Sequence, residues 1–154
     1  MEKEALKRIF DFLEAKEGEN SPVKWKIINN EPLLEEDLNV YGDLDFRFSS
    51  ITSLPEGLNV GRDLDLHYSK ITSLPKGLKV GGWLDLSDSD IEFLPKGLKV
   101  VGDLDLRYTE INSLPKGLKV GGDLLIFGTP IAKFDDDELR EMIKPGFIKG
   151  EILE

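Results

Sequence analysis

The residues best suited to chemistry are His67, the only histidine of the chain, and a set of aspartates that recur every 20 residues. With Asp65 and Ser49 nearby on the expected sheet, His67 could be drawn into a Ser-His-Asp hydrolytic set. These side chains are expected on an open surface that offers neither a pocket nor oxyanion donors, so nothing would activate the serine or exclude water. The sequence therefore predicts no enzyme and no catalytic residue.

Paired aspartates also supply oxygen atoms, which are the ligands that calcium prefers. Calcium takes about six to eight oxygens from a loop that wraps the ion, whereas a flat ladder of aspartates presents only a few at any point. The chain has 0 cysteines, which excludes a thiolate metal site and a cysteine nucleophile. Its sequence also lacks a phosphate-binding loop and a dinucleotide fingerprint. We therefore expect no metal ion and no cofactor.

The balance of charges narrows the class of partner. The chain has 30 Asp and Glu residues against 20 Lys and Arg, a net charge of −10, which disfavours nucleic acid and favours a protein partner with a basic patch. A length of 154 residues suits a single domain. The opening MEKEALKRIF lacks the apolar core of a signal peptide, and no stretch reaches transmembrane length. We expect a bacterial cytoplasmic protein that does not bind membranes, with export by a type III or other non-classical route left open.

A repeat of 20 residues must position all of these side chains. The phrases SLPEGLNVGRDLDLHYSKI, SLPKGLKVGGWLDLSDSDI and FLPKGLKVVGDLDLRYTEI restate one another, and a fixed period in this range is typical of a solenoid. Five copies begin at Leu34, Leu54, Leu74, Leu94 and Leu114. Apolar residues recur at the same places in each copy, so stacking would join them into columns of core.

Each copy is expected to supply one short strand. The stretch GDLDLRY alternates apolar and polar residues, which is the pattern of a strand with one buried and one wet face. Strands of successive copies must then run parallel in one sheet. The rest of the copy, TEINSLPKGLKVG, is rich in proline and glycine and too short for an ordinary helix, so it is expected to be extended or 3₁₀.

The phrase LDLRYTEI resembles the leucine-rich-repeat signature L-x-L-x-x-N-x-L, and LPKGL resembles the short bacterial class of that family, with its 20-residue repeats. Members of this class occur in bacterial and phage proteins and in secreted effectors that bind host proteins. The resemblance implies an α/β solenoid with a parallel β-sheet on one, concave face, extended or 3₁₀ turns on the other face and helical caps at both ends.

Two features depart from that signature. Gly61 and Gly81 stand where an apolar residue is expected, so a nearby valine is expected to be buried instead. Hydroxyl residues replace the usual Asn, whose side chain bonds the backbone in successive turns, and hydroxyls make such bonds more weakly. The hydroxyl residues are Ser49, Ser69, Ser89, Thr109 and Thr129.

Both ends of a solenoid expose core and need covers. Before the repeats, apolar residues at helical spacing predict a helix over 3–16, and VKWKI predicts a strand over 23–28. After them, Asp135 and Glu138 resemble a capping box that starts a short amphipathic helix, and GFIKGEIL is expected to add a closing strand. The single domain thus divides into an N-terminal cap (1–33), five repeats (34–133) and a C-terminal cap (134–154).

Polar residues on the expected strand point outward and form columns when the copies stack. One column is Asp43, Asp63, Trp83, Asp103 and Asp123, and the next is Asp45, Asp65, Asp85, Asp105 and Leu125. Either duplication merely copied a polar residue onto a wet face, or the negative field attracts a basic partner and speeds its encounter. Duplication does not explain Trp83, which breaks the first column.

An exposed tryptophan among aspartates, with tyrosines and an arginine nearby, has the composition of an interface hot spot. Flat packing against the tyrosines as a local stabiliser of the sheet is a second explanation, compatible with the first. We therefore predict a monomeric, non-enzymatic protein-protein interaction module that binds through the acidic, aromatic-containing concave sheet face. The predicted binding residues are Trp83, Tyr68, Tyr108, Arg107, His67, Asp63, Asp85, Asp103 and Asp105.

Two alternatives remain at this point. The chain could be a purely structural or self-assembling element of a phage or bacterial assembly, with oligomers formed through an end strand. The second alternative concerns lysines that recur on the opposite surface. We expect them to form a solvated face, with their stems over apolar surface, and a phosphate or membrane site is the other interpretation. These lysines are Lys76, Lys79, Lys96, Lys99, Lys116 and Lys119.

Overall fold

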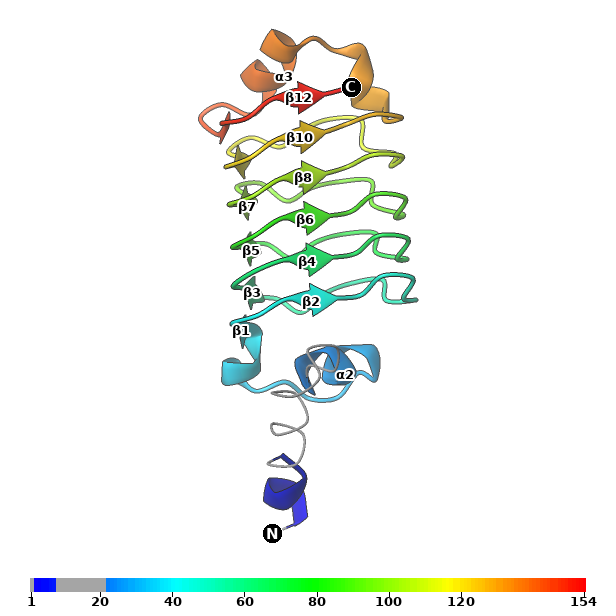
Figure 1. Cartoon of the computed structure of the whole chain (residues 1–154), viewed down its shortest axis with the longest axis vertical. Helices are drawn as coiled ribbons and strands as arrows, with labels where there is room; N and C mark the ends of the chain where they lie inside the picture. Colours follow the sequence, from blue (N-terminus) through cyan, green and yellow to red (C-terminus); the bar gives the residue numbers. More distant parts are fainter. Residues whose placement is uncertain (1, 8–21) are drawn as a thin grey trace.

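The computed structural model describes residues 2–7 and 22–154, and the repeats wind into a β-solenoid (Figure 1). Strand pairing places Asn39 beside Asn59 and Leu44 beside Leu64, so a full coil takes 20 residues. All of the strand pairs are parallel. The repeat, the solenoid and the parallel pairing predicted from the sequence are confirmed.

Two sheets run along the solenoid, and each contains six strands in the described part of the chain. The first sheet consists of β1 (Asn39–Val40), β3 (Asn59–Val60), β5 (Lys79–Val80), β7 (Lys99–Val100), β9 (Lys119–Val120) and β11 (Phe147–Ile148). The second consists of β2 (Leu44–Asp45), β4 (Leu64–Asp65), β6 (Leu84–Asp85), β8 (Leu104–Asp105), β10 (Leu124–Leu125) and β12 (Ile152–Leu153).

The prediction of one strand per copy is wrong, because the two residues after PKGL, such as Lys79–Val80, form a second strand where extended or 3₁₀ chain was expected. Leu78 and Val80 point into the core and are each 1% exposed, whereas Lys79 between them faces outward. This alternation spans only three residues before glycines interrupt it, so it is a weak signal in the sequence. The burial of Val60 and Val80 beside Gly61 and Gly81 was predicted and is confirmed.

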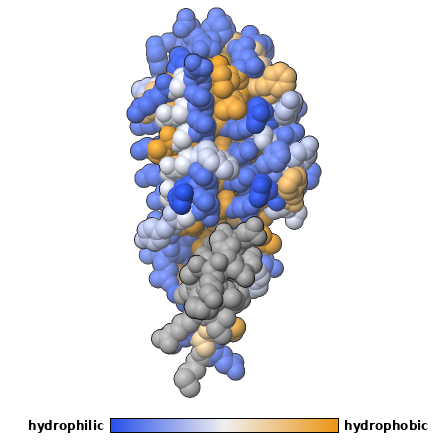
Figure 2. Space-filling view, in the orientation of Figure 1, coloured by the Kyte–Doolittle hydropathy of each residue, from blue (hydrophilic) through white to orange (hydrophobic). Residues whose placement is uncertain are grey.

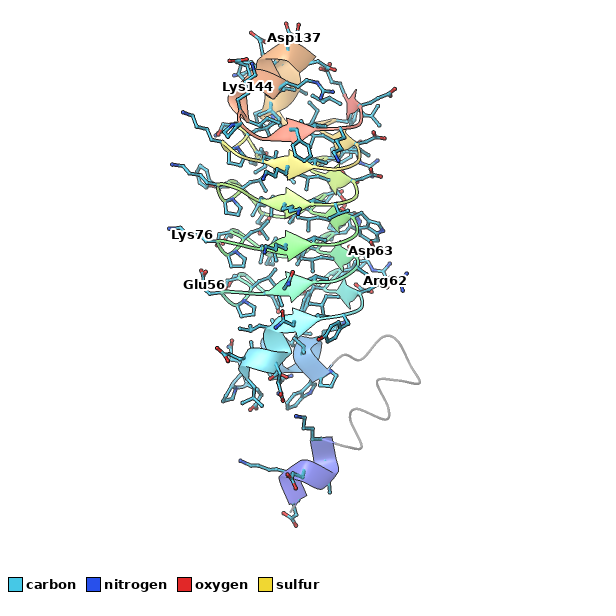
Figure 3. The ribbon with its side chains drawn as sticks, turned by 90° about the vertical axis from the view of Figure 1, so that its left-hand side faces the viewer. Glu56, Arg62, Asp63, Lys76, Asp137 and Lys144 are labelled. Carbon is cyan, nitrogen blue, oxygen red and sulfur yellow. The ribbon has the colours of Figure 1, made fainter. Side chains whose placement is uncertain are left out.

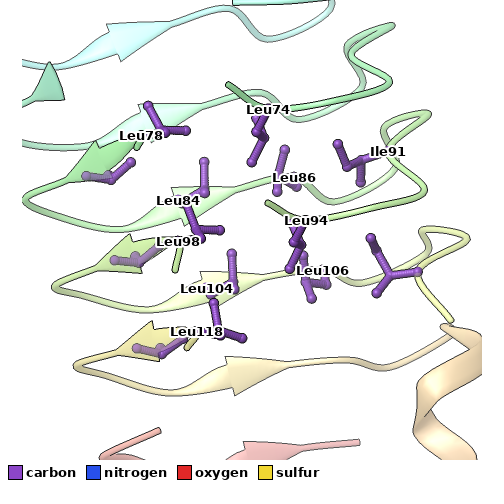
Figure 4. Packing of buried hydrophobic residues seen from close by; sticks show 14 of the residues in the cluster. Leu74, Leu78, Leu84, Leu86, Ile91, Leu94, Leu98, Leu104, Leu106 and Leu118 are labelled. Carbon is purple, nitrogen blue, oxygen red and sulfur yellow. The ribbon is translucent and has the colours of Figure 1, made fainter. Parts of the chain in front are cut away.

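Side chains from both sheets meet in one core along the axis (Figure 4). Leu84 and Leu86 enter this core from the second sheet and are 0% exposed. Ile91 closes the core on the side of the loops, also at 0% exposure. Each column continues in the next coil, so every coil depends on its neighbours for burial. The first copy differs, since Leu34 is exposed and the 3₁₀ helix η1 (Glu35–Leu38) replaces the PKGL turn.

A tight turn follows β2, β4, β6, β8 and β10 of the second sheet and places one residue in the left-handed region. In the coil of Asp88, the N–H of Ser89 donates to the Leu86 carbonyl, and Asp88 has a φ of 55°. A left-handed conformation costs a residue with a side chain about 1–2 kcal/mol. The chain nevertheless carries Phe48, Tyr68, Asp88 and Tyr108 at this position, and only the last copy has a glycine there, Gly128.

Of the hydroxyl residues that replace the expected Asn, Ser69, Ser89, Thr109 and Thr129 are buried and Ser49 is half-buried. Most of their side-chain bonds stay within their own coil. The hydroxyls of Ser89, Thr109 and Thr129 each donate to the carbonyl three residues earlier, at 2.6, 2.7 and 2.6 Å. These hydroxyls therefore stabilise the tight turn of their own coil. The resemblance to the leucine-rich-repeat signature implied the opposite, namely side-chain bonds between successive coils. Ser49 is different, because its buried hydroxyl has no hydrogen-bond partner in the described structure.

At the N-terminal end, residues 2–7 are helical, and the rest of the predicted helix over 3–16 lies outside the described residues. The predicted strand over 23–28 is wrong, because the segment forms helix α2 (Pro22–Ile28). Proline at the first position and Asn30 after the end, with a φ of 53°, are helix start and stop signals. The apparent alternation arose because Val23 and Ile27 lie four residues apart on one helical face.

The C-terminal end lengthens the last coil. Helix α3 (Asp136–Met142) begins with the predicted capping box, in which Asp135 and Glu138 bond each other's backbone N–H groups. The 3₁₀ helix η2 (Pro130–Lys133) precedes it. The tail then adds two strands where one was expected, β11 beside β9 and β12 beside β10. In the described part of the chain, no helix has the length and apolar character needed to cross a bilayer.

Candidate functional site

The outward surface of the second sheet carries the two predicted columns of aspartates, and we call it the acidic face. It consists of Asp43, Asp63, Trp83, Asp103, Asp123, Asp45, Asp65, Asp85, Asp105 and Leu125. The side of the molecule in Figure 2 is largely hydrophilic, with scattered apolar patches. The coils stack into a straight column in Figures 1 and 3, so this face is flat and the expected concave curvature is absent.

Aspartates of the first column hold neighbouring coils together. The carboxylate Oδ1 of Asp43 accepts the backbone N–H of Asp63 at 3.0 Å, and Oδ1 of Asp63 accepts that of Trp83 at 2.9 Å. Asp103 and Asp123 repeat the bond to the next coil, at 2.8 Å in both cases. Each carboxylate thus satisfies a backbone donor at the corner of the following coil.

Aspartates of the second column fix the path of their own coil. Oδ1 of Asp65 accepts the N–H of His67 at 3.0 Å, and Oδ1 of Asp85 accepts that of Ser87 at 2.9 Å. Asp45 and Asp105 make the same bond to the residue two positions later, at 3.0 Å. Neither interpretation of the aspartate columns from the sequence included these hydrogen bonds. Which backbone N–H a carboxylate reaches depends on the path of the chain, and the sequence alone does not give that path. Both columns of aspartates therefore stabilise the backbone of the solenoid.

We expect Asp63→Ala to lower the free energy of unfolding by about 1–2 kcal/mol, since the backbone N–H of Trp83 would lose its acceptor. Asp63→Asn keeps an oxygen in the same place and should restore most of that stability. Urea titrations of both variants give the comparison. Equal stability of Asp63→Ala and the wild type would show that relief of repulsion between carboxylates outweighs the bond.

Trp83 interrupts the first column and makes no such bond. An indole N–H only donates, so the side chain at 83 cannot accept the N–H of Asp103 as its sister aspartates do. Trp83 is 39% exposed. It lines a groove of about 180 Å³ whose other walls are Leu84, Asp85, Asp103, Asp105 and Leu125. We call this the Trp83 groove.

The predicted tyrosines belong to a different part of the surface. Tyr68 and Tyr108 sit at the left-handed turn positions and are 53% and 55% exposed. Tyr68 stacks on Phe48, with ring centroids 5.6 Å apart, and Tyr108 meets Phe127 edge to face at 5.5 Å. Neither tyrosine lines the Trp83 groove, so flat packing of Trp83 against them is not the arrangement found.

Sequence reasoning missed three apolar residues on this side of the molecule. These are Phe48, Phe127 and Leu125, of which only Leu125 belongs to the two columns predicted from the sequence. Leu125 ends the second column of aspartates and lines the groove, so it is a second exception to the ladder and could have been singled out as Trp83 was. Phe48 and Phe127 are 73% and 52% exposed and are the ring partners of Tyr68 and Tyr108.

His67 does not assemble a hydrolytic set. Its Nδ1 lies 2.8 Å from Oγ of Ser87, which in turn bonds Asp85, so the serine stands between the other two. In a hydrolytic set the histidine must bridge serine and aspartate. The buried hydroxyl of Ser49, which was considered as the nucleophile, has no partner in the described structure.

Burial raises the pKa of Asp65, and the neighbouring carboxylates of Asp85 and Asp45 add to this effect. Ionisation at neutral pH is therefore costly in the folded state. The stability contributed by a carboxyl with a raised folded pKa is present below its unfolded pKa and is lost as the pH rises through the folded pKa.

Asp65→Asn should accordingly stabilise the fold at pH 7 by about 0.2–1 kcal/mol, the range typical of charges near a surface. Its amide oxygen can still accept the N–H of His67. The gain in stability should vanish as the pH falls below about 4, the ordinary pKa of a carboxyl group. Thermal melts of both proteins across this range measure it, and a gain that grows at low pH would contradict the assignment.

Two arginines bind aspartates of the acidic face in a forked geometry. Nε and Nη2 of Arg107 donate to the two carboxylate oxygens of Asp105 at 2.9 and 2.6 Å. This bond raises the pKa of Arg107. Arg47 holds Asp45 in the same way, at 3.0 and 2.7 Å, and lowers the pKa of that carboxyl. Arg107, predicted to bind a partner, is thus already engaged within its own coil.

The lysines repeat on surfaces away from the acidic face. Figure 3 shows Lys76 projecting from the side opposite Asp63. Lys79, Lys99 and Lys119 are in register on neighbouring strands of the first sheet. Within residues 2–7 and 22–154, no group of three or more His, Asp or Glu side chains is arranged to hold a metal ion.

Comparison of the chain with protein-family models, with curated proteins and with solved structures gives no match. The geometry of the acidic face is therefore the basis for inferring a function.

Proposed function

We propose that the chain is a non-enzymatic protein-binding module that acts through the acidic face, with the Trp83 groove at its centre. One observation carries the proposal. Trp83 replaces an aspartate whose carboxylate would accept a backbone N–H in the next coil, and it exposes an indole in its place. The exchange gives up that hydrogen bond between coils and leaves the indole 39% exposed, which favours a reason outside the fold for this side chain.

The surroundings of Trp83 suit a protein partner better than a small ligand. A groove of about 180 Å³ is smaller than the clefts of about 300–1,000 Å³ that hold small molecules. It matches one inserted side chain within a flat contact. Aromatic anchors in such contacts often contribute about 2 kcal/mol or more to binding. The carboxylates around the groove favour a partner with a basic patch, and they would speed its approach.

The runner-up is a structural or self-assembling element, and one feature favours it. The lysine ladder of the first sheet and the carboxylates of the second repeat at the same coil spacing on one straight column. Copies could therefore align side by side through opposite charges. Sedimentation of the purified chain from low to high concentration separates the two, because a binding module stays monomeric and an assembling element gains mass in low salt.

We also propose that the repeats are related to the short bacterial leucine-rich-repeat class. The phrase LDLRYTEI supports this, since it places Leu104, Leu106 and Ile111 in the core of its coil. The second sheet and the hydroxyl bonds within a coil set the chain apart from that signature. A bacterial or phage source, and a cytoplasmic place of action or export from it, are proposed on the same relationship.

Quantitative affinity capture tests the proposed function. Wild type, Trp83→Asp and Lys96→Glu would be immobilised at equal density and exposed to one bacterial lysate, with retained proteins measured by mass spectrometry. We expect a protein that is retained by wild type and Lys96→Glu and is depleted on Trp83→Asp. A retained set that is the same for Trp83→Asp and the wild type would contradict the proposal.

A further inference from the structure

Two coils of the acidic face have the aspartate of the second column without an arginine two residues later, since His67 follows Asp65 and Ser87 follows Asp85. Asp65 is still reached by Arg47 of the preceding coil at 3.5 Å, whereas Asp85 has no such ion pair among the described residues. Where an arginine follows two residues after the aspartate, as in Arg107 after Asp105, its guanidinium binds both carboxylate oxygens. In the coil of Trp83 that position is Ser87, which bonds Oδ1 of Asp85 through its N–H and its hydroxyl. Asp85 therefore has the carboxylate of such a pair without the guanidinium.

The groove beside Trp83 contains this carboxylate together with a second one. Asp85 and Asp103 both line it, and no lysine, arginine or histidine within the described residues forms an ion pair with either. Trp83 and Leu125 supply apolar walls. The groove thus offers negative charge, an aromatic ring and an aliphatic surface within the space of one long side chain.

We propose that the Trp83 groove binds an arginine side chain of the partner, with the guanidinium against Asp85, Asp103 and the indole of Trp83. This inference rests on the proposed function and names the chemistry of its partner. Arginine fits better than lysine for three physical reasons. Its planar fork matches a carboxylate, it stacks on an aromatic ring, and it is less strongly hydrated than an ammonium group. Its methylene groups would lie along Leu125.

A titration followed by NMR tests this inference without a known partner. The probe is acetyl-arginine methylamide, compared at equal ionic strength with its lysine and citrulline analogues. Citrulline keeps the shape of arginine but has no charge. We expect saturable shifts of the Trp83 indole N–H, with a dissociation constant for arginine about two- to fivefold lower than for lysine. The citrulline analogue should give no saturable shift.

Isosteric variants locate the charge that matters. Asp85→Asn and Asp103→Asn keep an oxygen for their backbone bonds, so the fold should persist, and each should weaken arginine binding about two- to fivefold. Glu110→Gln removes the same charge from an exposed residue outside the groove, and it should leave binding unchanged.

Three outcomes would overturn the inference: equal binding of arginine and lysine, saturable binding of citrulline, or an equal effect of Glu110→Gln and Asp85→Asn. The test is separable from that of the proposed function. A captured protein that needs Trp83, combined with no preference for arginine in the titration, would refute the arginine inference alone.

Discussion

Replacing Leu104 with alanine is expected to lower the free energy of unfolding by about 2–5 kcal/mol. Leu104 is 0% exposed and lies between Leu84 and Leu124, its equivalents in the coils on either side. A solenoid coil is narrow and buries its side chains only against its neighbours. The cavity would therefore weaken two contacts between coils, and denaturant titration measures the loss.

The same coil supplies a matched control. Val101 is 55% exposed and stands where three of the other four copies have glycine, so Val101→Ala should change stability by less than about 0.5 kcal/mol. If Val101→Ala were the more damaging change, the assignment of inward and outward positions would be wrong.

Trp83→Asp is expected to reduce the affinity for the partner at least about tenfold while leaving the fold intact. The loss follows from the position of the indole, which forms one wall of a groove in an otherwise charged surface. Truncation of such an aromatic anchor commonly costs about 2 kcal/mol or more of binding free energy. The new carboxylate can accept the N–H of Asp103, as Asp63 accepts that of Trp83, and this bond offsets the lost contacts of the indole, so the fold should persist.

Two measurements are needed for this variant, thermal melting and the dissociation constant for the captured protein. Lys96→Glu is the control, because it changes a charge on an exposed loop away from the acidic face. Full affinity of Trp83→Asp together with lost affinity of Lys96→Glu would move the binding site to the lysine side.

Much of the solenoid was predictable because each signal is repeated in successive copies. The columns that contain Leu84, Leu86 and Ile91 read as core in each of the later copies, and they are buried. The outward direction of Trp83 followed from the same alternation. Single signals were less reliable, since Val23, Trp25 and Ile27 suit a strand and also one and a half turns of helix, and the segment is helix α2.

The parts that were not predictable depend on distances between coils. The carboxylate of Asp63 reaches the backbone N–H of Trp83 because of the path that the chain takes at the corner of the coil. The residue types alone do not reveal that path. The separation of Tyr68 and Tyr108 from the groove has a similar cause, because the tight turn carries them past the end of the strand. Of the predicted binding residues, Trp83, Asp85, Asp103 and Asp105 line the groove, and Tyr68, Tyr108 and His67 lie in aromatic contacts outside it. Asp63 and Arg107 belong to neither group, because each is engaged in hydrogen bonds of the fold.

Site-specific photo-cross-linking tests the central claim most directly, namely that the partner binds at the Trp83 groove. Benzoylphenylalanine would replace Trp83 in one protein and Phe93 in another. Phe93 is 62% exposed in the following loop and lies outside the groove, so it controls for exposure and hydrophobicity. We predict a covalent adduct with the partner from position 83 and none from position 93. An adduct from position 93 without one from position 83 would contradict the account.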